Sequence, residues 1–338
     1  MAKVTSVDVA NKAGVSRSAV SRVFTPGASV SKSTAEKVRA AAHALGYRPN
    51  VLARSLITGR SRIIGLVVAY LENQFYPEAI ERLSRQLQQQ GYHVLVFMAS
   101  NDDGATQQVI DELLDYQVDG IIAASVGLSN TLTQRCEDLG IPIVLFNRRQ
   151  RDERLSSVTS DNIAGGRKLA EFLIRGGHQR IAHIAGWEGA STQIDREAGF
   201  VQGLAQGGQS LFARGMGNFD YATAQQAARD MFSTPDRPDA VFVTNDHMAF
   251  AVMDVLRFEL GLSVPQDVSV VGYDDVTLSH WPSYDLTTVR QPANRMAAET
   301  VRILMDRLNT GHNSPQSVAL DGPLITRSSA RKPQGWTT

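Results

Sequence analysis

Residues Asn50–Arg62, NVLARSLITGRSR, separate two parts of the chain that differ in composition. The part that ends at Arg62 contains eleven Lys or Arg and two acidic residues, which gives a net charge of +9. The remainder carries −9, so the formal net charge of zero over 338 residues conceals the asymmetry. A basic segment of this kind indicates a polyanionic partner for the N-terminal part alone. The stretch itself is either a plain linker or the segment through which one part controls the other.

Length and composition bound the class of protein. A chain of 338 residues suggests two or three domains, with enough apolar side chains for a core of normal size. Cys136 is the single cysteine, which excludes an intrachain disulfide and favours a reducing compartment. The N-terminus lacks the apolar segment of a secretory signal, and no apolar run approaches the roughly 20 residues that cross a bilayer. We therefore expect a soluble, cytoplasmic protein.

Three short helices are predicted before the dividing stretch. Thr5 can cap the first, Gly14 breaks it, and Ser16 can cap the second, while Ser33–Leu45 forms the third. Apolar residues at helical spacing give each helix one face for a shared core. A tight glycine turn between the first two of three short helices is typical of a helix-turn-helix.

The second of these helices suits DNA, because a helix fits the major groove and presents its N-terminal side chains to base edges. Arg17 and Arg22 lie on the side of this helix away from its apolar face. Each can donate two hydrogen bonds to guanine, at O6 and N7. Lys3, Lys32 and Lys37 are better placed, as point charges, for phosphates. A small helical module that binds another protein is the alternative interpretation.

The runs VTSVDVANKAGVSRSAVSRVF and VSKSTAEKVRAAAHALGYRPNVLARSL resemble the N-terminal region of the lactose-repressor (LacI/GalR) family of bacterial transcription regulators. The similarity continues through the whole chain. In that family, the positions that match Arg17, Ser18 and Arg22 contact bases. The pair Arg17-Ser18 is this chain's own, so the operator of a relative does not transfer to it. The residues expected at the DNA are Thr5, Ser16, Arg17, Ser18, Ser21, Arg22, Asn50, Ala53 and Leu56.

The dividing stretch also has the signals of a short helix. Asn50 can cap it, and Thr58-Gly59 would end it. Its length of about seven residues is below the roughly 12–15 at which an isolated helix is even marginal in water. The resemblance implies that DNA supplies the missing stability, with the two hinge helices of a dimer paired in the minor groove. It also implies that Leu56 wedges into the central base step, and ordinary packing of Leu56 against the core is the alternative.

After Arg62, apolar runs alternate with amphipathic helices, which predicts parallel sheets covered on both faces. The candidate strands are Ile63–Ala69, His93–Met98, Val118–Ala123, Ile141–Phe146, Arg180–Ala185, Asp239–Val243, Val268–Gly272 and part of Leu286–Pro292. They fit two doubly wound subdomains of about five or six strands better than one sheet. The predicted fold class is thus an all-α helix-turn-helix head plus an α/β core of two doubly wound parallel-sheet subdomains. The resemblance implies a periplasmic-binding-protein-like arrangement of that core.

The expected domains are a headpiece (residues 1–49), a hinge (50–62), an effector-binding core (63–330) and a loose tail (331–338). Within the core, the first subdomain takes residues 63–160 and 290–321, and the second takes 161–289 and 322–330. The return to the first subdomain from Gln291 onward is implied by the resemblance alone. Since no long apolar heptad segment follows Leu324, a homodimer is the simplest assembly.

Ligands of open α/β sheets bind at the carboxyl ends of the strands. Polar and aromatic residues follow several predicted strands, and the resemblance assigns Arg196, Asn245 and Asp274 to the effector pocket. The effector-binding candidates are Asn73, Phe75, Asn147, Thr192, Arg196, Phe219, Asn245 and Asp274. Amides, an arginine, a carboxylate and aromatic rings together suit a small polyhydroxylated ligand, a sugar or sugar derivative.

Several candidates have structural alternatives. Asp246 opens a helix and is interpreted as its cap, whereas Asn245 has no such structural reason to be there. Arg196 could pair with Glu197 or Asp195, although adjacent residues rarely face each other on a helix.

Two further residues concern the kind of effector. Phe219 matches an aromatic that covers a ligand ring in some family members, with core packing as the alternative. Ala190 stands where the purine-binding branch of the family places an additional arginine. This difference argues against a purine effector.

Motifs for catalysis and cofactors are not found in the sequence. It contains no GxxxxGK[ST], HExxH or GxSxG, and GMGNFD carries Asp220 in place of the third glycine of a dinucleotide fingerprint. A single cysteine cannot build a zinc site. We therefore expect no enzyme, no metal and no cofactor.

The leading hypothesis is a ligand-responsive transcription regulator of the nucleoid. It is a repressor that binds a pseudo-palindromic operator as a homodimer. The alternative is a receptor of the periplasmic sugar-binding type without regulatory DNA binding. That alternative predicts an export signal and no basic head, and the sequence fits neither expectation.

Overall fold

The computed structural model describes residues 4–25, 28–48, 60–99, 103–150, 152, 154–311 and 314–336. The chain divides into two compact units, Met1–Ser61 and Arg62–Thr338. Within the described ranges, no helix is both long and apolar enough to cross a membrane. Three of the expected DNA contacts lie outside the described residues: Asn50, Ala53 and Leu56.

The first unit holds three helices, α1 (Ser6–Ala13), α2 (Arg17–Val23) and α3 (Lys32–Leu45), which confirms the predicted helix-turn-helix. Each helix turns an apolar face inward. The shared core consists of Val9, Ala10, Val20, Val38, Ala41 and Ala42. A core of this size is small, so the ends of the helices contribute a large share of the stability of the unit.

The ends of these helices follow the predicted signals. Thr5 and Asp8 form a capping box at the start of α1, in which the backbone N–H of Thr5 donates to Asp8 Oδ2 at 2.8 Å. Ser16 caps α2. Gly14 and Gly46 end α1 and α3 with φ of 65° each, a left-handed conformation that glycine adopts without a steric penalty.

The second unit contains two six-stranded sheets, ordered β11-β5-β4-β3-β1-β2 and β12-β10-β9-β8-β6-β7, which confirms the predicted fold class. The strands of the first sheet are β1 (Ile63–Val68), β2 (His93–Met98), β3 (Gly120–Ala124), β4 (Ile143–Phe146), β5 (Ser156–Ser160) and β11 (Ser317–Leu320). Those of the second are β6 (Ile181–Ala185), β7 (Ala213–Met216), β8 (Ala240–Val243), β9 (Ser269–Asp274), β10 (Thr287–Arg290) and β12 (Leu324–Ile325). The pairing is parallel throughout the described strands except between β10 and β12.

Helices cover both faces of each sheet. On the first sheet, α5 and α12 pack on one face and α6 and α7 on the other; on the second, α8 and α9 face α10 and α11 across the strands. The helices are α5 (Phe75–Gln89), α6 (Asp103–Asp115), α7 (Asn130–Asp138), α8 (Asn162–Arg175), α9 (Ser191–Gln206), α10 (Tyr221–Phe232), α11 (Asp246–Asp254) and α12 (Ala293–Thr310). A π-helical turn, Val255–Glu259, continues α11, and a 3-10 turn, Thr277–His280, follows β9.

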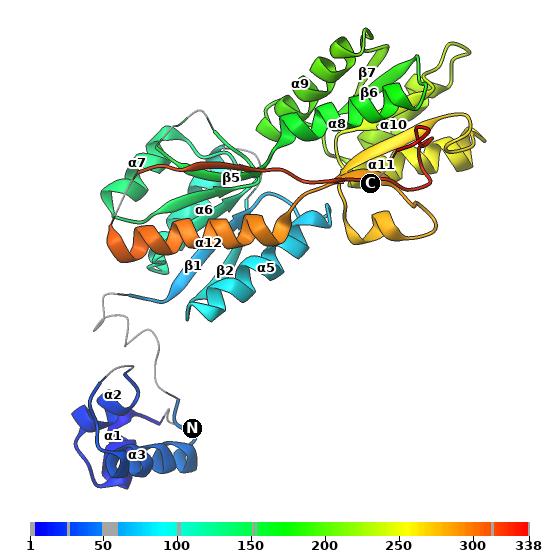
Figure 1. Cartoon of the computed structure of the whole chain (residues 1–338). Helices are drawn as coiled ribbons and strands as arrows, with labels where there is room; N and C mark the ends of the chain where they lie inside the picture. The colour runs from blue at the N-terminus through cyan, green and yellow to red at the C-terminus, as the bar shows by residue number, and fades with distance from the viewer. Residues whose placement is uncertain are drawn as a thin grey trace. The chain divides into compact units, whose positions relative to one another are not determined.

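The chain passes between the two sheets three times. It leaves the first sheet after β5, returns after β10, and leaves again between β11 and β12. After the return, α12 packs beside α5 of the first sheet (Figure 1). The crossings start at the carboxyl ends of β5, β10 and β11. The loops that follow the strands of both sheets therefore lie close to one another at these crossings.

Two expectations about this unit are wrong. The sequence pattern does not predict β5, β7, β11 or β12, because these strands are short or polar; β5, SSVTS, buries serines instead of a run of apolar side chains. The C-terminal tail is not loose up to residue 336. Trp336 packs edge-on against Phe172 with ring centroids 5.3 Å apart, and Arg331 Nη2 lies 2.7 Å from His178 Nδ1.

Candidate functional site

The exposed face of α2 carries the candidate base contacts. Arg17, Ser18, Ser21 and Arg22 are all exposed, whereas Val20 is buried in the core of the unit. No acidic residue lies in the first turn of α2. Two guanidinium groups and two hydroxyls therefore reach solvent from one surface, which is the chemistry that base edges and phosphates require.

The other two described DNA candidates hold helix starts. The Thr5 hydroxyl donates to Asp8 Oδ2 at 2.7 Å. Ser16 Oγ accepts from the backbone N–H of Ala19 at 3.2 Å and lies 2.9 Å from Ser18 Oγ. Both hydroxyls hydrogen-bond within the protein, and these bonds fix where α1 and α2 begin.

In the second unit, a buried ion pair joins two of the effector candidates. Arg196 Nη2 lies 3.2 Å from Asp274 Oδ1, and the two side chains are 3% and 1% exposed. The Asp274 carboxylate also accepts from Gln291 Nε2 at 2.7 Å and from Asn73 Nδ2 at 3.0 Å. Burial raises the pKa of Asp274, and the charge of Arg196 opposes that rise. Since Asn73 follows β1 and Asp274 ends β9, the carboxylate connects the two subdomains.

Arg196 makes further contacts that hold its guanidinium in place. Its Nη1 donates to the Thr244 carbonyl at 2.7 Å, and the group lies 3.7 Å from the ring centroid of Tyr273. The pairing with a sequence neighbour, left open by the sequence, does not occur. Both neighbouring acids bind other arginines: Asp195 binds Arg149 and Glu197 binds Arg214.

The prediction that Asp246 caps α11 is wrong, because Asn245 is the cap. Asn245 Oδ1 caps α11 by accepting from the backbone N–H of Met248 at 3.0 Å. Asp246 instead accepts from Ser279 Oγ and Thr288 Oγ1, at 2.6 Å each, underneath the loop after β9. Burial, and then the nearby Asp274, raise the pKa of Asp246 to about 7. Asp246 therefore supports that loop, and Asn245 serves as the cap while its amide nitrogen stays available.

The remaining effector candidates lie at the same ends of the strands. Asn147, Phe75 and Thr192 are buried, and Asn147 Nδ2 donates to the Tyr76 hydroxyl at 3.1 Å. Phe219 is half-buried and packs on Gly186, where an added Cβ would lie 2.3 Å from the ring. This packing shows why residue 186 is glycine, and it leaves part of the Phe219 ring accessible.

Four buried polar atoms at these loops have no hydrogen-bond partner among the described residues. They are Asn147 Oδ1, Asn245 Nδ2, His247 Nε2 and Gln291 Oε1. Leaving such an atom unsatisfied costs about 1–3 kcal/mol, so each one is placed to bond a water molecule or a ligand. The atoms include acceptors and a donor, and they follow strands of both sheets. A small molecule with several hydroxyl groups would satisfy them.

Backbone strain collects at the same loops. Asn147, Phe219, Asp274 and Asp275 are non-glycine residues with φ of 66°, 60°, 127° and 57°. Each such conformation costs on the order of 1–3 kcal/mol and is found mostly where function holds a residue in place. Three of these four residues follow or end a strand, which is where ligands of doubly wound sheets bind.

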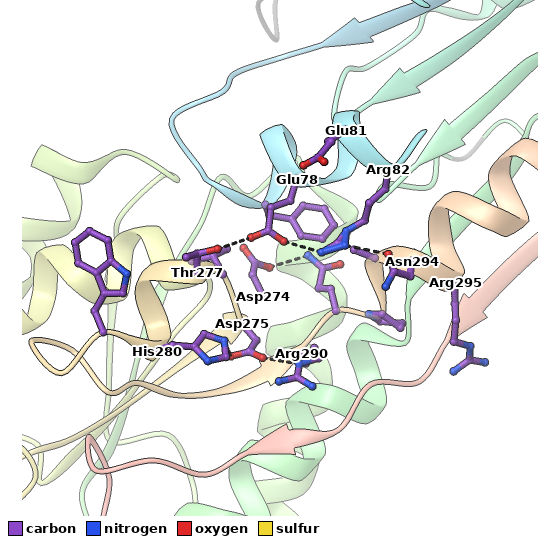
Figure 2. A pocket seen from close by; sticks show the side chains of 16 residues that line it. Glu78, Glu81, Arg82, Asp274, Asp275, Thr277, His280, Arg290, Asn294 and Arg295 are labelled. Atoms are coloured by element: carbon purple, nitrogen blue, oxygen red, sulfur yellow. Dashed lines mark hydrogen bonds and ion pairs between the residues drawn. The ribbon is translucent and has the colours of Figure 1, made fainter. Parts of the chain in front are cut away.

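A cavity of about 920 Å³ opens beside Asp274 (Figure 2). Phe75, Asp274 and Gln291, which belong to the buried group described above, also line this cavity. Residues from both subdomains also line it: Glu78, Arg82, Thr277, Trp281, Arg290 and Asn294. Among the described residues, no group of three or more His, Cys, Asp or Glu side chains is placed to hold a metal ion.

Sequence reasoning missed part of this site. Gln291 and Asn162 each bond a member of the buried ion pair, since Asn162 Oδ1 accepts from Arg196 Nε at 2.9 Å. Gln291 follows β10, so the rule that found the other candidates applies to it as well. Asn162 follows β5, a strand that the sequence does not predict. Trp187 lies with its ring 5.3 Å from the Arg148 guanidinium. Only its position after β6 could have marked it as a site residue in the sequence.

Comparison with known proteins agrees with this architecture. Residues 6–50 match the family described as bacterial regulatory proteins, lacI family, and residues 170–330 match a periplasmic binding protein-like domain. The HTH-type transcriptional regulator CelR of Thermobifida fusca is 34% identical over 331 residues, which are 95% of this chain and 96% of the relative. The HTH-type transcriptional repressor PurR of Vibrio vulnificus is 32% identical over 329 residues, covering 96% and 98%.

Solved structures give the same result. A CelR–cellobiose complex has a TM-score of 0.73 at 32% identity and covers 97% of this chain and 100% of its own. The lac repressor dimer bound to operator and the anti-inducer ONPF has a TM-score of 0.87 at 29% identity, covering 97% and 99%.

A helix-turn-helix unit followed by two periplasmic-binding-like subdomains defines a DNA-binding transcription regulator with a ligand-binding core. This chain belongs to the LacI family of bacterial transcription regulators. Its relatives named above are regulators rather than enzymes.

Proposed function

We propose that this protein is a repressor that binds a pseudo-palindromic operator as a homodimer. When a small sugar or sugar derivative binds the core, the affinity for the operator decreases or increases. It acts in the cytoplasm, at the nucleoid, and is not an enzyme. The observation that carries the ligand part is the group of unpartnered buried atoms at the carboxyl ends of strands from both sheets. A ligand that bonds both subdomains there changes how they lie relative to each other.

The chemistry of the site supports a sugar. Asp274 and Arg196 offer a fixed acceptor and donor, and Asn147 and Asn245 add one unpartnered atom each. Phe219 can cover the apolar face of a ring. The residues proposed to contact the effector are Asn73, Phe75, Asn147, Thr192, Arg196, Phe219, Asn245 and Asp274. The similar CelR structure holds cellobiose, which is a sugar.

Apolar side chains exposed on the second unit support the homodimer. Val96 and Met98 are 44% and 48% exposed on β2, which is the edge strand of the first sheet, and Phe258 is 81% exposed after α11. An exposed apolar edge strand is a site of association unless another surface covers it. The related lac repressor is a dimer on its operator, which is the assembly that we propose here.

Domain roles follow from this proposal: a headpiece at residues 1–49, a hinge at 50–62, a core at 63–330 and a tail at 331–338. We assign residues 63–160 and 290–321 to the first subdomain, and 161–289 and 322–330 to the second. In the headpiece and hinge, Thr5, Ser16, Arg17, Ser18, Ser21, Arg22, Asn50, Ala53 and Leu56 form the proposed DNA interface. Effector binding and DNA binding then meet at the hinge.

The test uses the full chain and a random DNA library. Repeated selection should enrich one sequence with two-fold symmetry, and a sugar from a screen should change the affinity for it. Because such coupling is an equilibrium, the operator must change the affinity for the sugar by the same factor. Equal sugar affinity with and without operator would refute regulation by the effector.

The hinge makes a separate prediction. Leu56→Ala should weaken operator binding far more than binding to DNA of unrelated sequence, since a wedge in the minor groove contributes only where the DNA kinks. Equal losses on both DNAs, measured by fluorescence anisotropy, would mean that Leu56 is no wedge.

A further inference from the structure

We infer that Gln193 is a positioning residue of the proposed effector site. Its buried side chain holds the loops after two strands of the second sheet, and these loops fix the places of Arg196 and Phe219. This inference rests on the proposed function and adds to it a residue that acts through its neighbours. It is carried by four short hydrogen-bond contacts of one amide group.

The side-chain oxygen of Gln193 joins the ends of two paired strands. Gln193 Oε1 accepts from the backbone N–H of Gly186 at 2.6 Å and from the Thr244 hydroxyl at 2.6 Å. Gly186 follows β6 and Thr244 follows β8, and these strands lie next to each other in the second sheet. The loops after both strands are thereby tied to the first turn of α9.

Thr244 connects Gln193 with the buried arginine of the site. The Thr244 hydroxyl donates to Gln193, and the Thr244 carbonyl oxygen accepts from Arg196 Nη1 at 2.7 Å. Gln193 and Arg196 are three residues apart on α9, so their side chains share one face of the helix. Because both side chains bond Thr244, a shift of Thr244 moves the guanidinium of Arg196 as well.

Gly186 connects Gln193 with the aromatic side chain of the site. The Phe219 ring packs so closely on Gly186 that an added Cβ would lie 2.3 Å from it. Without the oxygen of Gln193, the backbone N–H of Gly186 loses a hydrogen bond in a buried place, and the loop must move to regain one. A displaced Gly186 then displaces Phe219.

The amide nitrogen of Gln193 fixes the orientation of the side chain. It donates to Glu197 Oε2 at 2.6 Å and lies 3.2 Å from His183 Nε2. His183 Nδ1 lies 2.9 Å from the Phe242 carbonyl oxygen, so the proton of the neutral ring is on Nδ1 and Nε2 accepts. Two acceptors therefore face the nitrogen of Gln193, and two donors face its oxygen. A neutral amide satisfies both pairs, which explains a glutamine at this buried position.

The test compares two substitutions in the full chain. Gln193→Met keeps the length of the side chain and removes both polar atoms, whereas Gln193→Glu keeps the accepting oxygen. Crystal structures without ligand should show the Arg196 guanidinium displaced from the Thr244 carbonyl in Gln193→Met. Calorimetric titration with glucose, galactose, ribose, cellobiose, maltose and lactose should show about tenfold weaker binding of any sugar that the natural chain binds, the effect of one lost buried hydrogen bond. Gln202→Met, at an exposed glutamine of the same helix, is the matched control and should change neither result.

Gln193→Glu adds a dependence on pH that a general loss of packing would not produce. The second oxygen of the new carboxylate faces Glu197 and the neutral ring of His183, and none of these groups has a proton to donate at pH 8. Arg214 bonds Glu197, and Glu188 bonds Arg214, which completes the charged groups of this cluster. Uptake of a proton as the pH falls restores the hydrogen bond. The sugar affinity of this variant relative to the natural chain should therefore rise from about one tenth at pH 8 toward equality at pH 5.5.

The outcomes separate this inference from the proposed function. An undisplaced Arg196 in Gln193→Met, or an affinity of Gln193→Glu reduced equally at both pH values, would overturn the positioning role and leave control by a sugar intact. If no sugar binds the natural chain, the proposed effector class fails, and the crystal structures alone decide whether Gln193 positions Arg196. If Gln193→Met does not fold, crystal structures of Gln193→Glu at the two pH values make the same comparison, with the guanidinium displaced at pH 8 and in its natural place at pH 5.5.

Discussion

The headpiece keeps its proposed DNA contacts in solvent, whereas the core buries most of its proposed effector contacts. Arg17 and Arg22 are exposed on α2, while Arg196 and Asp274 are buried. An exposed arginine has little effect on the free energy of folding, and its guanidinium can bind a phosphate or a base. A buried arginine must be paired within the protein, so its position is part of the stability of the core.

This difference teaches that the same residue type has different consequences in the two units. Removing an arginine from the headpiece should change binding and leave stability nearly unchanged. Removing the arginine of the core should change both. Substitutions in the two units can therefore separate a recognition surface from a site that also holds the fold together.

The largest effect is expected at Arg196. Arg196→Met leaves the carboxylate of Asp274 buried without its cation, which should lower the free energy of unfolding of the core by about 3–5 kcal/mol. Urea denaturation followed by circular dichroism measures the change. Arg196→Met combined with Asp274→Leu should recover part of the loss, because the uncompensated charge is then absent.

The matched control is Arg229→Met. Arg229 pairs with Glu259, and both side chains are more than a third exposed, so the loss should be small because solvent screens the pair. Equal losses for Arg196 and Arg229 would contradict the contrast between buried and exposed arginines.

A second effect of burial is a dependence of stability on pH. His183 is fully buried, its Nδ1 lies 2.9 Å from the Phe242 carbonyl oxygen, and burial lowers its pKa from 6.5 to about 4. Between these values the unfolded chain binds a proton that the folded chain does not. The contribution of neutral His183 is thus complete above about pH 6.5 and lost as the pH falls toward 4, by about 3 kcal/mol.

The measurement is the free energy of unfolding from pH 7.5 to 4. The variant His183→Gln should be less stable at neutral pH but should show a shallower decline toward acid. His93→Gln changes an exposed histidine and should leave the slope unchanged. A slope in His183→Gln as steep as in the natural chain would assign the acid loss to other groups.

The same contrast explains what the sequence could and could not predict. Caps such as Thr5 and Ser16 act within three residues, so their role is visible locally. Asp246 was misread as a cap because its partners Ser279 and Thr288 lie 33 and 42 residues away.

Contacts between the two subdomains join residues that lie still farther apart in the sequence. Asn73 and Asp274 are 201 residues apart, and only the fold brings them together. The strand rule and the family resemblance named both residues as candidates, but neither could show that they bond each other. Pairing between side chains is decided by packing, which periodicity does not encode.

In the headpiece, Arg17→Ala should weaken binding to the operator by about 1–3 kcal/mol and relax the preference at one base position. Lys37→Ala should instead weaken binding to all sequences alike. It should also reduce the slope of the logarithm of the binding constant against the logarithm of the salt concentration by about one. Selection of binding sites with each variant, together with salt titrations, distinguishes the two. An unchanged sequence preference in Arg17→Ala would remove Arg17 from the recognition surface.

The smallest effect concerns the stability of the headpiece itself. Ser31 caps α3, with its hydroxyl accepting from the backbone N–H of Thr34 at 3.2 Å. Ser31→Ala should lower the stability of this unit by about 1 kcal/mol, since the first turn of α3 loses a partner.

Ser33→Ala removes a hydroxyl from the same turn without removing the cap, so it should be close to neutral. Because the apolar core of the headpiece is small, such a loss should appear as a lower melting temperature for this unit while the transition of the core stays in place. Equal shifts for Ser31→Ala and Ser33→Ala would mean that exposed hydroxyls, rather than the cap, set the stability of the recognition surface.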